Sequence, residues 1–228
     1  MEKNREELNE IIRLLREKYP EGDKCSLTFK SPVQLLVSTI LSAQCTDVRV
    51  NKVTPSLFAR FPDAASLALA DVSEIEELIH SCGLYRSKAA NIKKCAEMIV
   101  ERFGGTVPDN IDDLTKLPGT GRKTANLVIG EWFGRPAYVI DTHVKRIWHL
   151  IGITDSETPE SIERDLRLLI PPEDPEASDA LALSHLLITH GRNTCKAGRP
   201  DCAVCCIKEH CDHFGKNTPS GTDKDNKK

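Results

Sequence analysis

Apolar positions recur at helical spacing along most of this chain, and the strict alternation of apolar and polar residues that is typical of strands is nearly absent. Near the N-terminus, one face of an amphipathic helix carries Leu8, Ile11, Ile12, Leu15 and Tyr19. We find no internal sequence repeat, so the helices are not expected to form a regular array. The pattern therefore predicts an all-α protein.

Capping residues and helix breakers divide this pattern into separate helices. Ser31 and Pro32 are the N-cap and first residue of a predicted helix that runs through Ile40. Ser73 and Glu76 form a predicted capping box ahead of another helix. Further helices are predicted over residues 47–60, 86–103, 142–151, 159–169 and 176–190, with a short one beginning at residue 111.

Length and charge restrict the classes of function. A chain of 228 residues can bury more than one core, and we expect two domains. The formal net charge of −3 gives no overall attraction to nucleic acid, so any DNA contact must come from local basic groups and backbone amides. No apolar run is long enough for a signal peptide or a membrane span, which predicts a cytoplasmic protein without a targeting segment.

Four of the nine cysteines are spaced C-x6-C-x2-C-x5-C near the end of the chain: Cys195, Cys202, Cys205 and Cys211. A set of four sulfur ligands selects zinc or an iron–sulfur cluster. Disulfides are rare in a reducing compartment, and the other five cysteines lie outside this spacing. Cys206 directly follows one proposed ligand, so either Cys205 or Cys206 could coordinate, and the spacing favours Cys205.

Residues 114–125, LTKLPGTGRKTA, predict a short helix, a tight glycine turn and a second helix. Gly119 and Gly121 allow backbone geometry that a Cβ atom would obstruct, so amides at the helix start can approach a phosphate oxygen. An ordinary helix corner with glycine caps is the alternative. The segment is thus a candidate DNA-backbone contact that does not depend on base sequence.

Two residues, Lys123 and Asp141, are candidates for catalysis. Lys123 lies in the first helical turn, where the helix dipole and Arg122 disfavour the protonated amine, and a lysine nucleophile must be neutral. The alternative is a solvated lysine that binds phosphate. Asp141 precedes an amphipathic run, so it is predicted to be the N-cap of that helix. A cap would fix the direction of its carboxylate, which could then stabilise a cationic sugar.

Several motifs in one order resemble those of the endonuclease III family of DNA glycosylases, and the similarity extends from about residue 7 to residue 214. They are residues 41–44 (LSAQ) with Thr46-Asp47, 83–85 (GLY), 117–125 (LPGTGRKTA), 139–143 (VIDTH), 190–192 (HGR) and the cysteine quartet. The resemblance implies two helical domains with a DNA cleft between them.

The domain boundaries also follow from this resemblance. A six-helix barrel domain is expected over residues 25–135, with the helix-hairpin-helix at residues 114–125. The terminal-helix and iron–sulfur domain is expected to combine residues 1–24 and 136–214, with a cluster loop at residues 195–211. Residues 215–228 are expected to be a disordered tail.

The implied activity is that of a bifunctional DNA glycosylase and abasic-site (AP) lyase of base excision repair. Lys123 would attack the sugar C1′, displace the base and form a Schiff base that permits β-elimination, with Asp141 as the catalytic carboxylate. Flipping the nucleotide costs stacking energy, and Gln44 and Leu84 match the family's gap-filling and wedge residues. The implied partner is double-stranded DNA with oxidised pyrimidines or abasic sites, bound by a monomer associated with the nucleoid.

The resemblance favours a [4Fe–4S] cluster over zinc as the cofactor. Lys196 and Arg199 lie between the first two ligands, so the cluster would hold a basic loop against the DNA backbone. A monofunctional mismatch or adenine glycosylase of the same superfamily is one alternative, and Lys123 argues against it. A non-catalytic iron–sulfur DNA-binding module is another, and the presence of both Lys123 and Asp141 argues against that.

Overall fold

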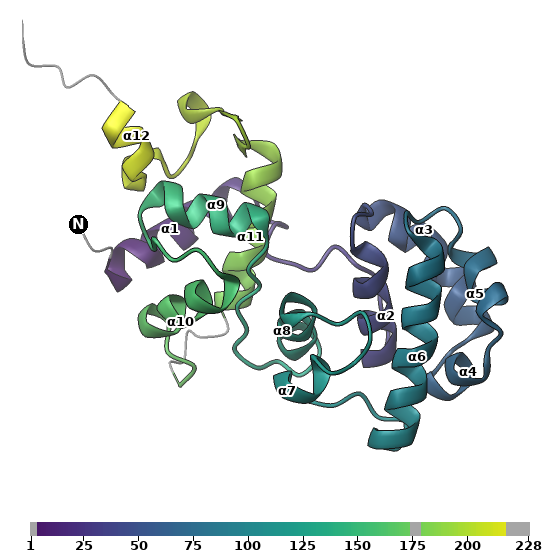
Figure 1. Ribbon diagram of the computed structural model, residues 1–228. Coiled ribbons are helices and arrows are strands. Elements are labelled where there is room, and N and C mark those ends of the chain that lie inside the picture. Colours follow the sequence, from purple (N-terminus) through teal and green to yellow (C-terminus); the bar gives the residue numbers. More distant parts are fainter. Residues whose placement is uncertain (1–3, 174–178, 218–228) are drawn as a thin grey trace, which may run out of the picture. The chain divides into compact units, whose positions relative to one another are not determined.

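The structure, a computed structural model, describes residues 4–173 and 179–217, and the regular secondary structure within them is almost entirely helical (Figure 1). The longer elements are α1 (Arg5–Lys18), α2 (Pro32–Ser42), α3 (Asp47–Arg60), α4 (Ala64–Leu69), α5 (Val72–Ile79), α6 (Tyr85–Phe103), α8 (Arg122–Glu131), α9 (Thr142–Ile151), α10 (Pro159–Leu169), α11 (Asp179–Asn193) and α12 (Asp212–Asn217). The short α7 covers Ile111–Leu114, and β1 (Cys195–Lys196) pairs with β2 (Arg199–Pro200). The all-α prediction is confirmed.

The chain folds into two compact units. The central unit comprises Lys24–Val139 together with the start of α11 through Leu181. The terminal unit contains the residues before Lys24, those that follow Val139, and the rest of α11 onward. None of the described helices is long and apolar enough to cross a membrane.

The central unit is built around apolar faces of α2 and α6. Leu35, Leu36 and Leu41 of α2 are fully buried, and α6 packs against α2, α4 and α5. The start of α2 follows the capping signal in the sequence, because the Ser31 side chain accepts a hydrogen bond from the Gln34 amide at 3.2 Å. This core fixes the loops that precede α3, α6 and α8.

Two features of the central unit differ from the sequence prediction. Helix α5 begins at Val72 and is capped by Asp71, whereas Ser73 lies inside the first turn and donates its hydroxyl to the Asp71 carboxylate. Helix α4 was not predicted. Its capping box uses Asp63 and Ser66, and its six residues are too few to display a helical period.

In the terminal unit, the predicted N-terminal helix buries Leu8, Ile11 and Leu15. Helices α9 and α10 have the predicted bounds, whereas α11 ends three residues later than predicted, at Asn193. Helix α12 continues through Asn217, so it includes the first three residues of the segment predicted to be a tail. Residues 218–228, the rest of that predicted tail, lie outside the described residues.

Candidate active site

The glycine turn between α7 and α8 depends on one glycine more than on the other. Gly119 has φ of +80°, and a Cβ atom there would lie 3.2 Å from the Cβ of Asn91. Gly121 has an extended backbone, is the N-cap of α8, and a Cβ there would meet no atom within 4 Å. Because glycine has no side chain to accept from the first amides, α8 begins without a side-chain cap.

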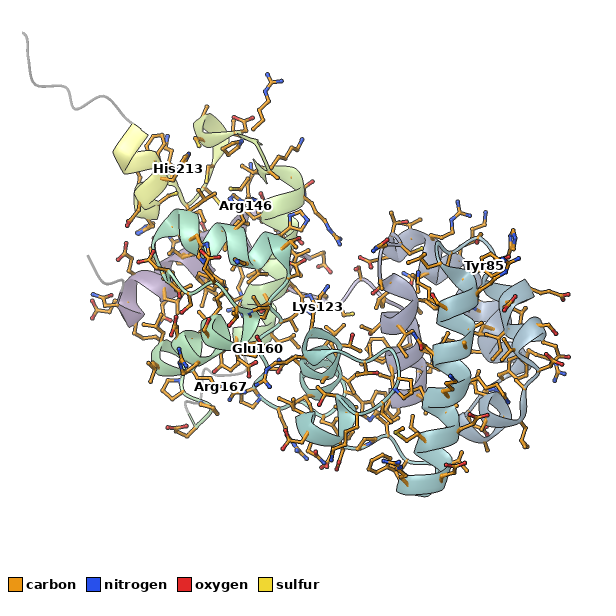
Figure 2. All side chains as sticks on the ribbon, in the orientation of Figure 1. Tyr85, Lys123, Arg146, Glu160, Arg167 and His213 are labelled. Carbon is orange, nitrogen blue, oxygen red and sulfur yellow. The ribbon has the colours of Figure 1, made fainter. Side chains whose placement is uncertain are left out.

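Lys123 is the second residue of α8 and its side chain is exposed (Figure 2). The helix behind it is anchored by the buried Ala125 and Val128. The amine therefore belongs to a rigid element and lies one residue inside an uncapped helix N-terminus, where backbone amides and the helix dipole favour an anion.

Asp141 is the N-cap of α9, as predicted. Its Oδ1 atom accepts a hydrogen bond from the Val144 amide at 2.8 Å, and the residue is half-buried. The preceding residues Tyr138 and Val139 are buried, so the chain enters α9 from a fixed position. Lys123 belongs to the central unit and Asp141 to the terminal unit, and each is placed only within its own unit.

The structure brings the loops of Gln44 and Leu84 together. Both residues have a left-handed backbone, with φ of 53° and 57°, and among the described residues these are the non-glycine positions with positive φ. Gln44 is exposed and Leu84 is 60% exposed. A Cβ atom on Gly83 would lie 3.6 Å from the carbonyl oxygen of Gln44, so the two loops are neighbours. Strained backbone that presents exposed side chains is a feature of functional sites.

All four predicted cysteine ligands line one pocket of the terminal unit: Cys195, Cys202, Cys205 and Cys211. Ile147, Ile151, Ile207 and Phe214 also line it, whereas Cys206 is not among its lining residues. Two contacts place this loop against α9: Arg146 donates a hydrogen bond to the Cys195 carbonyl at 2.5 Å, and the Cys211 sulfur lies 3.3 Å from the Leu150 carbonyl oxygen. Figure 2 labels Arg146 on α9.

The donor set of this pocket fits an iron–sulfur cluster. Four cysteine thiols that line one pocket are the ligands that such clusters use. Within residues 4–173 and 179–217, no three or more histidine, cysteine or acidic side chains gather closely enough to hold a metal ion.

Lys196 and Arg199 face each other on a two-stranded hairpin. They form one register pair of β1 and β2, next to the pair of Cys195 and Pro200. Gly198, with φ of +74°, allows the tight turn between the strands, and both basic side chains are exposed. We call this feature the basic hairpin. It presents two positive charges immediately beside the first cysteine.

Two residues near these sites were missed in the sequence. Lys88 is only 4% exposed, although lysine is rarely buried. His190 is 1% exposed, and burial, assisted by Arg146 and Lys18, lowers the pKa of its imidazole to about 4. His190 belongs to the motif at residues 190–192, and its position five residues before Cys195 was a signal of nearness to the cluster loop, but the sequence analysis assigned it no role.

A glycine hairpin, an exposed lysine at an uncapped helix N-terminus and a four-cysteine loop on an all-α fold define a helix-hairpin-helix DNA-repair protein. Residues 37–172 match the family described as HhH-GPD superfamily base excision DNA repair protein. Endonuclease III of Synechocystis sp. is 50% identical over 212 residues, which cover 92% of this chain and 94% of that protein.

Two solved structures are similar as well. The structure of a non-covalent endonuclease III–DNA complex matches this chain with a TM-score of 0.83. The structure of a trapped endonuclease III–DNA covalent intermediate matches it with a TM-score of 0.84. Each of these structures is 35% identical to this chain, and the match covers 94% of this chain and 98% of the chain in that structure. The chain therefore belongs to the HhH-GPD superfamily and, within it, to the endonuclease III family.

Proposed function

We propose that Lys123 is the nucleophile and Asp141 the catalytic carboxylate of this enzyme. The chain is a DNA glycosylase with AP lyase activity that acts in base excision repair. The assignment of Lys123 as the nucleophile rests on one observation: its amine is exposed and lies one residue inside the uncapped N-terminus of α8. A phosphate bound by those amides would hold the DNA backbone beside the amine.

The chemistry follows from an amine acting on a deoxynucleotide. Neutral Nζ of Lys123 attacks C1′, the bond from C1′ to the base breaks, and the base leaves with the electron pair and a proton. Opening of the sugar gives an imine between Nζ and C1′. Loss of a proton from C2′ then expels the 3′ phosphate by β-elimination. The Asp141 carboxylate stabilises positive charge that develops on the sugar, because its cap hydrogen bond fixes its direction.

Gln44 and Leu84 are proposed to occupy the space that the flipped nucleotide leaves. Extrusion of a base costs a few kcal/mol of stacking, and least for a damaged base. An exposed leucine on a strained backbone offers apolar surface to the bases that remain, and the amide of Gln44 offers hydrogen bonds. The proposed substrate is double-stranded DNA with oxidised pyrimidines or abasic sites, bound by a monomer.

A [4Fe–4S] cluster held by Cys195, Cys202, Cys205 and Cys211 is the proposed cofactor. When bound, the cluster would cross-link the loop and would take no part in base removal. The loop residues then keep the basic hairpin in place, where Lys196 and Arg199 can contact phosphates. The exclusion of Cys206 from the pocket lining supports Cys205 as the ligand.

Borohydride trapping on abasic DNA tests the nucleophile. The wild-type protein should form a covalent adduct that survives denaturation, and Lys123→Gln should form none. Lys116→Gln is the matched control, because Lys116 is exposed near the start of the same hairpin and its amine pairs with Asp113. Undiminished trapping by Lys123→Gln would remove this residue from the mechanism. Base release without strand cleavage by the wild type would instead favour a monofunctional glycosylase.

Iron and sulfide analysis tests the cofactor. The purified protein should be yellow-brown and contain both elements, Cys206→Ala should retain them, and Cys205→Ala should lose them. Colourless protein that holds one zinc ion would contradict the cluster. Loss of iron from Cys206→Ala, with retention by Cys205→Ala, would exchange the two residues in the ligand set.

A further inference from the structure

Both ring nitrogens of His190 have partners, although the residue is 1% exposed. Nδ1 lies 3.0 Å from the Tyr19 hydroxyl and Nε2 lies 3.6 Å from the sulfur of Cys205. Tyr19 and Cys205 come from opposite ends of the chain, and α11 places His190 between them. A buried imidazole held at both nitrogens has a fixed orientation.

The Tyr19 hydroxyl is itself fixed by a second contact. Its oxygen lies 2.7 Å from Oγ1 of Thr194, a residue that is 5% exposed, and its ring meets the imidazole edge to face with centroids 5.8 Å apart. Two arrangements of protons satisfy these contacts. Either Thr194 donates to Tyr19 and Tyr19 donates to Nδ1, or the whole chain of donors runs in the reverse direction.

The chemistry of a cluster ligand selects between the two arrangements. A cysteine that binds iron does so as a thiolate, which has no proton and only accepts hydrogen bonds. The Nε2 atom that faces Cys205 must then carry a proton, and Nδ1 of a neutral imidazole must accept from Tyr19. An imidazolium would donate from Nε2 as well, so the direction of the bond to sulfur does not depend on the protonation state of the ring.

We propose that His190 is a positioning and tuning residue of the cluster, which donates a hydrogen bond from Nε2 to the sulfur of Cys205 and thereby raises the reduction potential. The inference rests on the proposed [4Fe–4S] cofactor. Hydrogen bonds to ligand sulfurs draw electron density from them and favour the reduced, more negative cluster. The same bond distinguishes Cys205 from Cys206, because the sulfur that Nε2 faces is that of Cys205.

Voltammetry of the cluster-loaded protein tests this inference. His190→Leu removes the donor, and its midpoint potential should shift to a more negative value than that of the wild type. His190→Gln keeps an amide donor near the position of Nε2 and should restore part of the shift. The matched control is His149→Gln, because His149 bonds the Ser156 carbonyl and does not line the cysteine pocket. Its potential should equal that of the wild type.

An unchanged potential in loaded His190→Leu overturns the inference. If that variant does not retain its cluster, pulsed electron paramagnetic resonance of the wild type decides. Protein grown with histidine that carries the heavy nitrogen isotope should show a coupling between the paramagnetic cluster and a histidine nitrogen, and its absence overturns the inference. Wild-type protein that lacks iron and sulfide would instead contradict the cofactor proposal itself.

Discussion

The ammonium of Lys88 donates a hydrogen bond to the carbonyl oxygen of Leu41 at 2.8 Å inside the central unit. This carbonyl belongs to the last turn of α2, where the negative end of the helix dipole attracts a cation. The backbone amide of Lys88 also donates to the carbonyl of Leu84 at 3.1 Å. One buried residue therefore joins the end of α2, which leads to Gln44, to the loop of Leu84.

The two loops joined by Lys88 are those with left-handed non-glycine residues. A left-handed backbone costs roughly 1–2 kcal/mol for such a residue, so the conformations of Gln44 and Leu84 persist only because their surroundings enforce them. The Lys88 contacts supply part of that enforcement. We infer that Lys88 positions the two proposed DNA-gap residues.

Replacement of Lys88 by methionine should reduce repair activity more than stability. The substitution leaves the Leu41 carbonyl unpaired, which costs about 1–3 kcal/mol, but it also removes a costly buried charge. Cleavage of lesion-containing duplex should fall by roughly 10-fold to 100-fold, because displaced positioning groups have effects of that size. Melting temperature and single-turnover cleavage are the two measurements. Lys94→Met, at an exposed position of the same helix, should change neither, and full activity in Lys88→Met would contradict the positioning role.

The two hairpin glycines should respond differently to alanine. Gly119→Ala places a Cβ atom on a left-handed backbone and against Asn91, so it should lower the free energy of unfolding by about 1–2 kcal/mol. Gly121→Ala adds a Cβ atom in open space on an extended backbone and should lower the melting temperature less than Gly119→Ala does. Its DNA affinity should nevertheless fall, since the methyl group stands where a phosphate would approach. Equal destabilisation by both variants would show that the hairpin contact is wrongly assigned.

The sequence predicted helix caps, which depend on neighbouring residues, but it did not predict contacts between residues that are far apart in the chain. Ser31 and Asp141 cap their helices as predicted, because a cap involves only the next three residues. The contact between Tyr19 and His190 joins residues 171 positions apart, and no local pattern indicates it. The sequence also did not indicate that Lys88 is buried, since the partner of its side chain is a backbone carbonyl, a group that every residue has.

Short elements and competing caps account for the remaining errors. Asp71 and Ser73 are both good N-caps, and in the structure Asp71 is the cap, because its carboxylate accepts from the amide and the hydroxyl of Ser73. The cysteine spacing favoured Cys205 over Cys206 as a ligand, but the absence of Cys206 from the pocket lining depends on how the loop folds. The positive φ values of Gln44 and Leu84 were unreadable because neither residue type favours that conformation.

Asp141 caps α9, and substitution can separate this capping from its proposed catalytic role. An asparagine side chain would cap α9 about as well as aspartate does, so Asp141→Asn should retain the wild-type stability while its turnover falls strongly. Asp141→Ala should lose turnover and about 1 kcal/mol of stability. Thr158→Ala removes the cap of α10 and is the matched control, because it should lose similar stability and keep its turnover. Near-normal turnover in Asp141→Asn would reduce Asp141 to a helix cap.

The basic hairpin should contribute to DNA affinity in a way that salt reveals. Lys196 and Arg199 are exposed and opposite each other, so both can contact phosphates of one DNA strand. Each phosphate contact adds about 0.9 to the slope of log affinity against log salt concentration, so the double variant Lys196→Gln/Arg199→Gln should lower that slope by about 1.8. Affinity should fall equally for intact and damaged duplexes, since phosphates carry no lesion information.

The control for the hairpin is a charge removed elsewhere. Arg13 is exposed on α1 and pairs with Glu10 and Glu17, so Arg13→Gln removes one positive charge without removing a proposed DNA contact. Its salt slope, measured by fluorescence anisotropy from low to moderate salt, should equal that of the wild type. A change of slope in Arg13→Gln half as large as that in the double variant would assign the effect to net charge. An unchanged slope in the hairpin variant would mean that the cluster loop does not bind the DNA backbone.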